Sequence, residues 1–326
     1  MINYSIIIPH KNIPDLLERC LASIPRRDDV QIVIVDDSSE ERLVDFARFP
    51  GTGRSGVDIV FHKSPIGGVG GSGMARNVGL GVATGKWLIF ADADDFFHTD
   101  AIAAAMDKHV DSEADMIFFR HDSVDSATLA PVEINTARNR SLADFDRVKS
   151  GADDRARIAA DDRVRFRITV PWARFIRREI VVSHGIRFDE VRFSNSELFS
   201  IKVGYFAEKI VSDPAVVYCN VRREGSLIHE GRRDWEAMSQ RFDVDYRAAL
   251  FAASVGKGAL WEGVVADRWR ELSLLHRRGA RKLLTRLREV CSARRVRQAR
   301  FEEAARRALS VFFKRHRKRN ILRNHA

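Results

Sequence analysis

Apolar runs that alternate with helical stretches organise the first 120 residues of the chain. Short runs rich in β-branched and aromatic residues predict strands at Tyr4–Pro9, Gln31–Val35, Val57–His62, Lys86–Ala91 and Met116–Arg120. The stretches between them predict helices at Ile13–Ile24, roughly Glu40–Arg48, Gly73–Ala83 and Asp100–His109. Strands and helices in this alternation form βαβ units with right-handed crossovers. The pattern therefore predicts an α/β fold with a mainly parallel sheet flanked by helices.

The pattern changes twice after residue 120. Residues 121–170 are polar and rich in charge, which predicts an irregular or partly helical excursion. A further strand is expected at Ala215–Asn220, and the pattern is helical from Asp234 onward. We expect three regions: residues 1–120 and 121–230 as two halves of one α/β domain, and residues 231–326 as a helical C-terminal appendage.

The C-terminal region is also the basic part of the chain. Residues 276–326 contain 18 Lys and Arg against 3 Asp and Glu, whereas the rest of the chain has a net charge of −5. Phe301, Ala305, Ala308 and Phe312 would share one face of a helix, and a basic run follows Phe313. A basic amphipathic helix suits an anionic membrane surface. Nucleic acid is an unlikely partner because no recognisable binding module is present.

Other whole-chain features exclude several classes of protein. The cysteines Cys20, Cys219 and Cys291 are few, odd in number and far apart, which argues against a disulfide framework or a zinc site. The first residues do not resemble a signal peptide, and no apolar run is long enough to span a membrane. We expect a cytoplasmic protein that can associate peripherally with the inner face of the plasma membrane.

Three carboxylates follow the apolar run Trp87–Phe90. They are Asp92, Asp94 and Asp95, at the exit of a strand predicted to be buried. Open α/β sheets bind ligands at this position, and Mg²⁺ commonly takes one or two carboxylates together with substrate phosphates. The Asp-x-Asp pattern therefore indicates a metal that holds a nucleotide diphosphate, while the alternative is a helix cap.

A second acidic pair, Asp36 and Asp37, follows another apolar strand. Carboxylates in this position can accept hydrogen bonds from a nucleobase edge or a ribose, and the alternative is again a turn or a helix cap. Two strands of one predicted sheet thus end in acids, which favours a shared ligand site.

A glycine-rich run opens the helix that begins near residue 73. Gly68, Gly70 and Gly73 match G-x-G-x-x-G, and Asp92 lies at the end of the next strand, as in a dinucleotide-binding fingerprint. The preceding strand ends too early for the required tight turn, and the acid is a cluster rather than a single residue. A dinucleotide-dependent oxidoreductase is therefore a lesser alternative.

Four short segments, in this order and spacing, resemble the family 2 glycosyltransferases, which have the GT-A fold. They are Ser5–Asn12, Ile34–Ser39, Ala75–Leu80 and Phe90–Asp95. A looser block is similar to the acceptor-side half of bacterial surface-polysaccharide members and consists of Pro171–Phe175, Gly185–Glu190, Phe193–Phe199 and Arg223–Leu227. The resemblance implies metal-dependent transfer of a sugar, with inversion, from a nucleotide-diphosphate donor to a saccharide or polyprenol-linked acceptor in surface polysaccharide synthesis.

The resemblance also implies a set of site residues. Those expected at the nucleotide, with a UDP-linked donor favoured, are Pro9, Lys11, Asp36, Asp37, Arg76, Asn77 and Asp92. Asp94, with Asp92, would ligate Mn²⁺ or Mg²⁺ on the diphosphate. Asp95 would support the metal site or approach the donor sugar. Lys11 departs from the aromatic residue that many similar proteins have there.

The general base has no direct match in this chain. In similar proteins it is an aspartate in a pair that matches Asn195 and Ser196 here, and a serine hydroxyl is not basic enough for this role. Glu197 is one alternative, and Asp189 or Glu190 is another. The third is a catalytically impaired protein that binds a nucleotide sugar, or one that uses another group.

Overall fold

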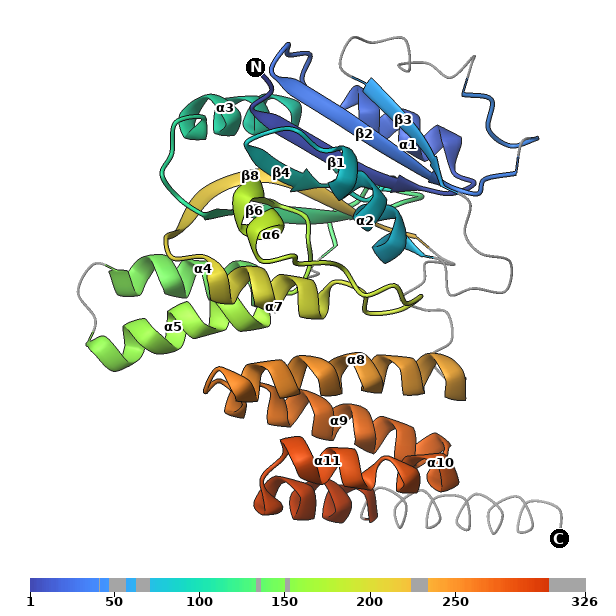
Figure 1. Ribbon diagram of the computed structural model, residues 1–326, viewed down its shortest axis with the longest axis vertical. Coiled ribbons are helices and arrows are strands. Elements are labelled where there is room, and N and C mark those ends of the chain that lie inside the picture. Colours follow the sequence, from blue (N-terminus) through green and yellow to red (C-terminus); the bar gives the residue numbers. More distant parts are fainter. Residues whose placement is uncertain are drawn as a thin grey trace, which may run out of the picture. The chain divides into compact units, whose positions relative to one another are not determined.

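The chain forms two compact units, Met1–His229 and Glu230–Ala326. The computed structural model describes residues 1–40, 42–46, 57–62, 71–132, 136–149, 153–223 and 234–304 (Figure 1). The first unit carries the sheet, and the second unit is helical.

One sheet of eight strands forms the centre of the first unit. The strands are β1 (Tyr4–His10), β2 (Val30–Asp37), β3 (Val57–His62), β4 (Trp87–Phe90), β5 (Phe96–Phe97), β6 (Met116–Asp125), β7 (Arg174–Arg177) and β8 (Ile210–Arg222), in the order β3-β2-β1-β4-β7-β6-β8-β5. Strands β3, β2, β1 and β4 are parallel to one another, and so are β6 and β8. The antiparallel β7 joins these two parallel groups.

Helices cover both faces of this sheet (Figure 1). They are α1 (Pro14–Ala22), α2 (Ser72–Val82), α3 (Thr99–His109), α4 (Thr136–Lys149), α5 (Asp154–Arg167), α6 (Arg178–Ser183) and α7 (Glu197–Phe206). Because side chains alternate along a strand, Ile6 and Ile8 of β1 pack with α1 and α3, whereas Ile7 packs in the other core with α2. Burial on both faces explains why the strands are continuous apolar runs.

The main differences from the expected elements lie in short or irregular segments. The described residues among 40–48 form turns rather than a helix. The excursion at residues 121–170 contains the end of β6 and two helices, α4 and α5, and the last strand extends in both directions to become β8. Two short strands were not expected from the sequence: β5 pairs with β8, and β7 pairs with β4.

The second unit is a group of helices with its own apolar core. Its helices are α8 (Trp235–Ser254), α9 (Ala259–Leu275), α10 (Arg277–Lys282), α11 (Leu284–Val290) and a helical stretch at residues 293–304. The core includes Phe242, Val265 and Leu272. Phe301 is 74% exposed, and Ala305, Ala308, Phe312 and Phe313 lie outside the described residues.

No helix within the described ranges has the length and apolar character needed to cross a bilayer.

Close packing of α2 on β1 and β2 makes Gly79 sensitive to substitution. A Cβ atom there would lie 2.5 Å from Ile7 Cγ2 and 3.3 Å from Val35 Cγ2. We expect Gly79→Ala to lower the free energy of unfolding by about 1–3 kcal/mol, the usual cost of overpacking a core. Urea unfolding of the purified variant measures the change.

Gly81 on the same helix is the matched control. A Cβ atom there meets nothing within 4 Å. Since alanine favours a helix over glycine, Gly81→Ala should leave the chain as stable or stabilise it by about 0.5–1 kcal/mol. Equal effects of the two substitutions would contradict this account of α2 packing.

A buried carboxylate fastens α3 to β8. Asp213 Oδ2 lies 2.8 Å from Lys108 Nζ and 2.8 Å from His109 Nε2. Burial works to raise the pKa of Asp213, but its hydrogen bonds with Lys108, Ala215 and His109 outweigh burial and lower the pKa to about 2. The stabilisation is therefore complete above the ordinary aspartate value of 3.8 and is lost as the pH falls towards 2.

We expect Asp213→Asn to lower the free energy of unfolding at neutral pH by about 2 kcal/mol. The difference from the wild type should shrink as the pH falls to about 2, because Asp213 then becomes protonated. Unfolding curves at a series of pH values test this expectation. A difference that does not change with pH would show that Asp213 does not act through its charge.

Candidate functional site

The carboxyl ends of β1, β2 and β4 meet at one edge of the sheet. The parallel register places His10 opposite Asp36 and Ile7 opposite Phe90. The acids that follow β2 and β4 are therefore brought to the same edge, as the sequence predicts for a ligand site.

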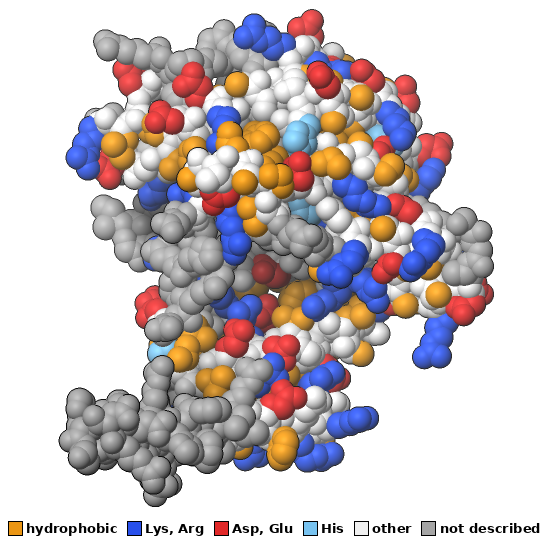
Figure 2. Space-filling model, turned by 180° about the vertical axis from the view of Figure 1, so that it is seen from behind, with side chains coloured by type: hydrophobic (Ala, Val, Ile, Leu, Met, Phe, Trp, Pro, Cys, Tyr) orange, Lys and Arg blue, Asp and Glu red, His pale blue; other side chains and the backbone are white. Residues whose placement is uncertain are grey.

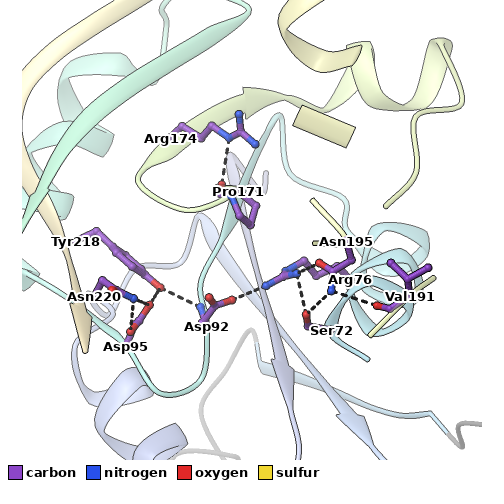
Figure 3. Close-up of polar contacts among 10 residues, drawn as sticks. All are labelled: Ser72, Arg76, Asp92, Asp95, Pro171, Arg174, Val191, Asn195, Tyr218 and Asn220. Carbon is purple, nitrogen blue, oxygen red and sulfur yellow. Dashed lines mark hydrogen bonds and ion pairs between the residues drawn. The ribbon is translucent and has the colours of Figure 1, made fainter. Parts of the chain in front are cut away.

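Asp92 is paired with a buried arginine at this edge (Figure 3). Arg76 Nη2 of α2 lies 2.5 Å from Asp92 Oδ1, and the Arg76 side chain is only 5% exposed, whereas that of Asp92 is 32% exposed. The guanidinium also lies over the Phe188 ring, 5.4 Å from its centroid. The Arg76 side chain is thus held in place by buried contacts, and the Asp92 carboxylate remains partly exposed.

Asn195 and Ser72 complete the surroundings of Arg76. Arg76 Nη1 donates to Asn195 Oδ1 at 3.0 Å and to Ser72 Oγ at 3.1 Å, and Asn195 Nδ2 donates to Ser72 Oγ at 3.0 Å (Figure 3). A Cβ atom on Gly73 would lie 2.2 Å from the Asp189 carbonyl oxygen and 2.9 Å from Asn195 Cβ. The segment from Asp189 to Asn195 therefore packs directly on the start of α2.

Asp95 is directed into the protein rather than towards the open edge. It is 1% exposed and accepts hydrogen bonds from Tyr218 Oη at 2.7 Å, Asn220 Nδ2 at 3.1 Å and the Val221 N–H at 2.7 Å. Tyr218 Oη in turn accepts from the Asp92 N–H at 3.0 Å. Asp95 thus uses β8 to fix the backbone of the acidic loop.

Within the acidic loop, Asp94 forms an ion pair with Arg223, the residue that directly follows β8. Arg223 Nε donates to Asp94 Oδ2 at 2.8 Å, and Arg19 Nη2 of α1 donates to the Asp94 carbonyl oxygen at 2.6 Å. The Asp94 and Arg223 side chains are 23% and 32% exposed. The side chain and the backbone carbonyl of Asp94 are therefore both held in place, while its carboxylate remains accessible to a ligand.

The negative charges of Asp92, Asp94 and Asp95 in the acidic loop repel one another. Burial raises the pKa of Asp95 well above its ordinary value, and the negative charges of Asp92 and Asp94 raise it further. Burial also raises the pKa of Asp92, with Arg76 opposing the rise and Asp94 adding to it.

A divalent cation would relieve this repulsion. The partly exposed carboxylates of Asp92 and Asp94 are hard oxygen donors of the kind that Mg²⁺ and Mn²⁺ prefer. Two carboxylates leave further coordination positions to substrate phosphates and water, so the donor set fits a metal that binds together with a diphosphate.

Asp36 and Asp37 end β2 and are each 5% exposed. Asp36 Oδ1 lies 2.9 Å from His10 Nδ1 and accepts from Ser39 Oγ at 2.5 Å. Burial works to raise the pKa of Asp36, but the hydrogen bonds with His10 and Ser39 prevail and lower it. Asp36 therefore fixes the loops that follow β1 and β2.

Two other residues predicted at the nucleotide flank these loops. Pro9 is half-buried in β1, and Lys11 is exposed just beyond the strand. Gly68 and Gly70 of the glycine-rich run lie outside the described residues, and β3 ends at His62, well before α2 starts at Ser72. This separation removes the tight strand-to-helix turn that a dinucleotide fingerprint needs.

Asn77 is turned towards the segment that carries two of the candidate bases. Its Nδ2 donates to the Phe188 carbonyl oxygen at 3.0 Å and to Glu190 Oε1 at 3.2 Å, and its Oδ1 accepts from the Phe188 N–H. The side chain predicted to contact the nucleotide is thus engaged in holding residues 188–190. Glu190 is exposed beside it, and Asp189 is half-buried.

Glu197 is the first residue of α7, and Ser196 precedes it at the helix start. Arg174 of β7 positions this helix, because its Nη2 donates to Ser200 Oγ at 2.6 Å. Glu197 lies one residue beyond Ser196, the position expected for the base, and one residue corresponds to about 100° on a helix. The Glu197 side chain therefore leaves the backbone in a different direction from that of Ser196.

Sequence reasoning gave no role to several residues that hold the site together. Tyr218 and Asn220 fasten Asp95, and Arg223 pairs with Asp94. A usable signal for Tyr218 and Asn220 was their i, i+2 spacing in a predicted strand, which places them on one face. His10, within the first motif, could have been paired with Asp36 by the register of parallel strands.

Comparison with known proteins agrees with this geometry. The family described as Glycosyl transferase family 2 matches the chain over residues 5–181. The uncharacterized glycosyltransferase EpsJ of Bacillus subtilis is 24% identical over 252 residues, which are 76% of this chain and 68% of that protein.

Solved structures share the fold. The Staphylococcus aureus TarS 1-349 structure in complex with UDP-GlcNAc has a TM-score of 0.62 at 16% identity and covers 93% of this chain and 88% of that one. The mannosyltransferase PcManGT of Pyrobaculum calidifontis, in complex with GDP-Man and Mn²⁺, has a TM-score of 0.53 at 18% identity, with coverages of 95% and 80%. The architecture is therefore the GT-A fold, and the family match shows that this chain belongs to glycosyl transferase family 2 and is a glycosyltransferase.

Proposed function

We propose that the chain is a metal-dependent, inverting glycosyltransferase that uses a nucleotide-diphosphate sugar, with UDP the favoured nucleotide. The observation that carries the proposal is the placement of Asp92 and Asp94, partly exposed, at the sheet edge where Asp36 and Asp37 also lie. The relatives in complex with UDP-GlcNAc and with GDP-Man and Mn²⁺ support this class of donor and metal.

In this proposal, different residues at the sheet edge bind different parts of the donor. The loops fixed by Asp36, together with Asp37 and Pro9, receive the nucleobase, and Lys11 stands where it can reach a phosphate. Asp92 faces the ribose, and Arg76 holds Asp92 in that position through the 2.5 Å ion pair. Asn77 acts indirectly, because its hydrogen bonds to Phe188 hold the segment at residues 188–190 in place.

Mn²⁺ or Mg²⁺ would be held by Asp94, with Asp92, and when bound would offset the charge that develops on the leaving diphosphate. Arg223, which pairs with Asp94, is placed to exchange that partner for a diphosphate oxygen. Asp95 holds the acidic loop in place through its hydrogen bonds to β8 and does not contact the donor.

The reaction requires a base at the acceptor hydroxyl. The hydroxyl oxygen bonds to the anomeric carbon while the bond from that carbon to the diphosphate oxygen breaks, and the hydroxyl proton passes to a carboxylate. We assign this base to Glu197, because Ser196 at the expected position is not basic enough and because Arg174 holds α7, the helix that Glu197 begins. Asp189 and Glu190 are the alternative bases.

The acceptor in this proposal is a saccharide or a polyprenol-linked saccharide of surface polysaccharide synthesis. A Mycobacterium bovis protein named "PGL/p-HBAD biosynthesis glycosyltransferase" is 36% identical over 105 residues, which are 39% of its length, and supports a biosynthetic role. In that role the protein would work in the cytoplasm, at the inner face of the plasma membrane.

Binding of UDP in the presence and absence of Mn²⁺ tests the proposal. Calorimetry should show that Mn²⁺ strengthens UDP binding to the wild type, and that Asp94→Asn loses at least about tenfold of this gain because a ligand is removed. Asp100→Asn, an exposed acid in the first turn of α3, is the control and should behave as the wild type. An affinity for UDP that is the same with and without Mn²⁺ would refute the metal-dependent site.

Single substitutions identify the base. Glu197→Gln should reduce kcat for sugar transfer by about 10²–10⁴-fold, the usual worth of a general base, with donor binding unchanged. Asp189→Asn and Glu190→Gln should each keep most of the activity. Loss with Asp189→Asn or Glu190→Gln instead would move the assignment, and a wild type that binds UDP but neither transfers nor hydrolyses any donor would be a binding protein.

A further inference from the structure

The helical unit has a small cavity lined mainly by cations. Its volume is about 130 Å³, and its lining residues are Trp269 and Ser273 of α9, Arg277 and Arg281 of α10, Leu284 of α11, and Arg300 and Glu303. Three guanidinium groups thus face one carboxylate. On the face shown in Figure 2, by contrast, acidic and basic side chains of the described residues are intermixed.

The floor of this cavity is firmly built. Trp269 and Ser273 are 4% and 3% exposed, and Trp269 Nε1 donates to the Ala280 carbonyl oxygen at 2.9 Å. This hydrogen bond fixes α10 against α9. The spacing of Arg277 and Arg281, four residues apart on α10, then puts both side chains on the same side of that helix.

The arginines around the cavity have no partners of their own. Within the described part of the chain, the side chains of Arg277, Arg281 and Arg300 take part in no hydrogen bond or ion pair, and all three residues are exposed. Other arginines of the same unit are paired, such as Arg268 with Asp245 and Arg286 with Asp243. Unpaired guanidinium groups gathered at one cavity favour an anionic ligand, and planar guanidinium forks match phosphate oxygens.

A second hollow adjoins the first and shares Arg277. Its volume is about 500 Å³, and it is lined by Trp235, His276, Arg277, Arg278, Gly279 and Lys282. The Trp235 ring lies directly on Gly279, where a Cβ atom would come within 2.4 Å of Trp235 Cη2. Arg278 and Lys282 are exposed and likewise without a partner in the described residues. An indole among cations is typical of a surface that meets lipid headgroups.

We propose that α10 and its neighbours form a binding site for a phosphate group, centred on Arg277, Arg281 and Arg300. The smaller cavity, about 130 Å³ in volume, is several times larger than the roughly 10–15 Å³ that one water needs, so it has room for a phosphate group. The phosphate belongs either to a lipid headgroup, with the larger hollow taking the adjoining glycerol, or to a small soluble molecule. The site is separate from the acidic edge of the sheet and does not rest on the proposed function.

The test uses the full chain and two kinds of probe. Calorimetry with inorganic phosphate and with glycerol 3-phosphate measures the soluble source. Cosedimentation with phosphatidylcholine vesicles, with and without phosphatidylglycerol, measures the lipid source. We expect phosphate-dependent binding to at least one probe that weakens as salt is raised.

Substitutions connect that binding to the cavity. Arg277→Ala with Arg281→Ala and Arg300→Ala should weaken it by at least about tenfold, given the contribution of each basic residue at an anionic surface. Arg288→Ala, an exposed arginine of α11 outside both hollows, is the control and should bind as the wild type. Arg277→Ala alone, at an exposed position shared by both hollows, guards against a folding defect in the triple variant and should also bind less well.

The results divide cleanly. Loss of vesicle binding with the triple variant supports a lipid headgroup, and loss of glycerol 3-phosphate binding alone supports a soluble ligand. A wild type that binds none of the probes overturns the proposal, and so does a triple variant that binds them as well as the wild type. UDP binding, which depends on the other unit, should be the same in all variants and reports on their integrity.

Discussion

A buried cation with defined partners sets the geometry of the sheet edge. Arg76 would carry an unfavourable charge in the interior without Asp92 and the hydrogen bonds to Asn195 and Ser72. Meeting this requirement joins α2, the loop after β4 and the segment before α7, which are far apart in the sequence. The position of the acid and the stability of the surrounding packing are therefore two consequences of one ion pair.

The same requirement is consistent with an uncharged amide at position 195. A carboxylate there would give Arg76 a second anionic partner and would compete with Asp92 for the guanidinium. The amide of Asn195 accepts a hydrogen bond from Arg76 without adding a charge. Asp92 then remains the acid that balances Arg76. In our proposal the proton acceptor is Glu197, because the position expected for the base carries Ser196.

The amount of structure that the sequence predicted depended on how local the signal was. Strands β1, β2, β3 and β4 and helices α2 and α3 were predicted close to their observed bounds, because burial on both faces makes a strand a continuous apolar run. The start of β6 was predicted correctly, but the strand continues to Asp125, beyond the predicted end at Arg120. The short β5 and β7 were missed, since their place in the sheet is set by partners far away in the sequence, such as Cys219 for Phe96 and Phe118 for Arg174.

The candidate site shows the same limit. Parallel strands that end in acids were enough to bring Asp36 and Asp92 to one edge. The direction of each side chain was not predictable, because it depends on distant donors: Asp95 turns inward to Tyr218 and Asn220, and Asp94 turns to Arg223. The resemblance assigned different roles to these acids, but the tertiary hydrogen bonds that direct each side chain lay outside what the motif contains.

The most direct test of the account is a crystal structure of the wild-type chain with UDP and Mn²⁺, in which anomalous scattering locates the metal. The account predicts Mn²⁺ within coordination distance of an Asp94 carboxylate oxygen and of both phosphates, with Arg223 released from Asp94. Diphosphate bound away from this loop, or Mn²⁺ held by other residues, would contradict it.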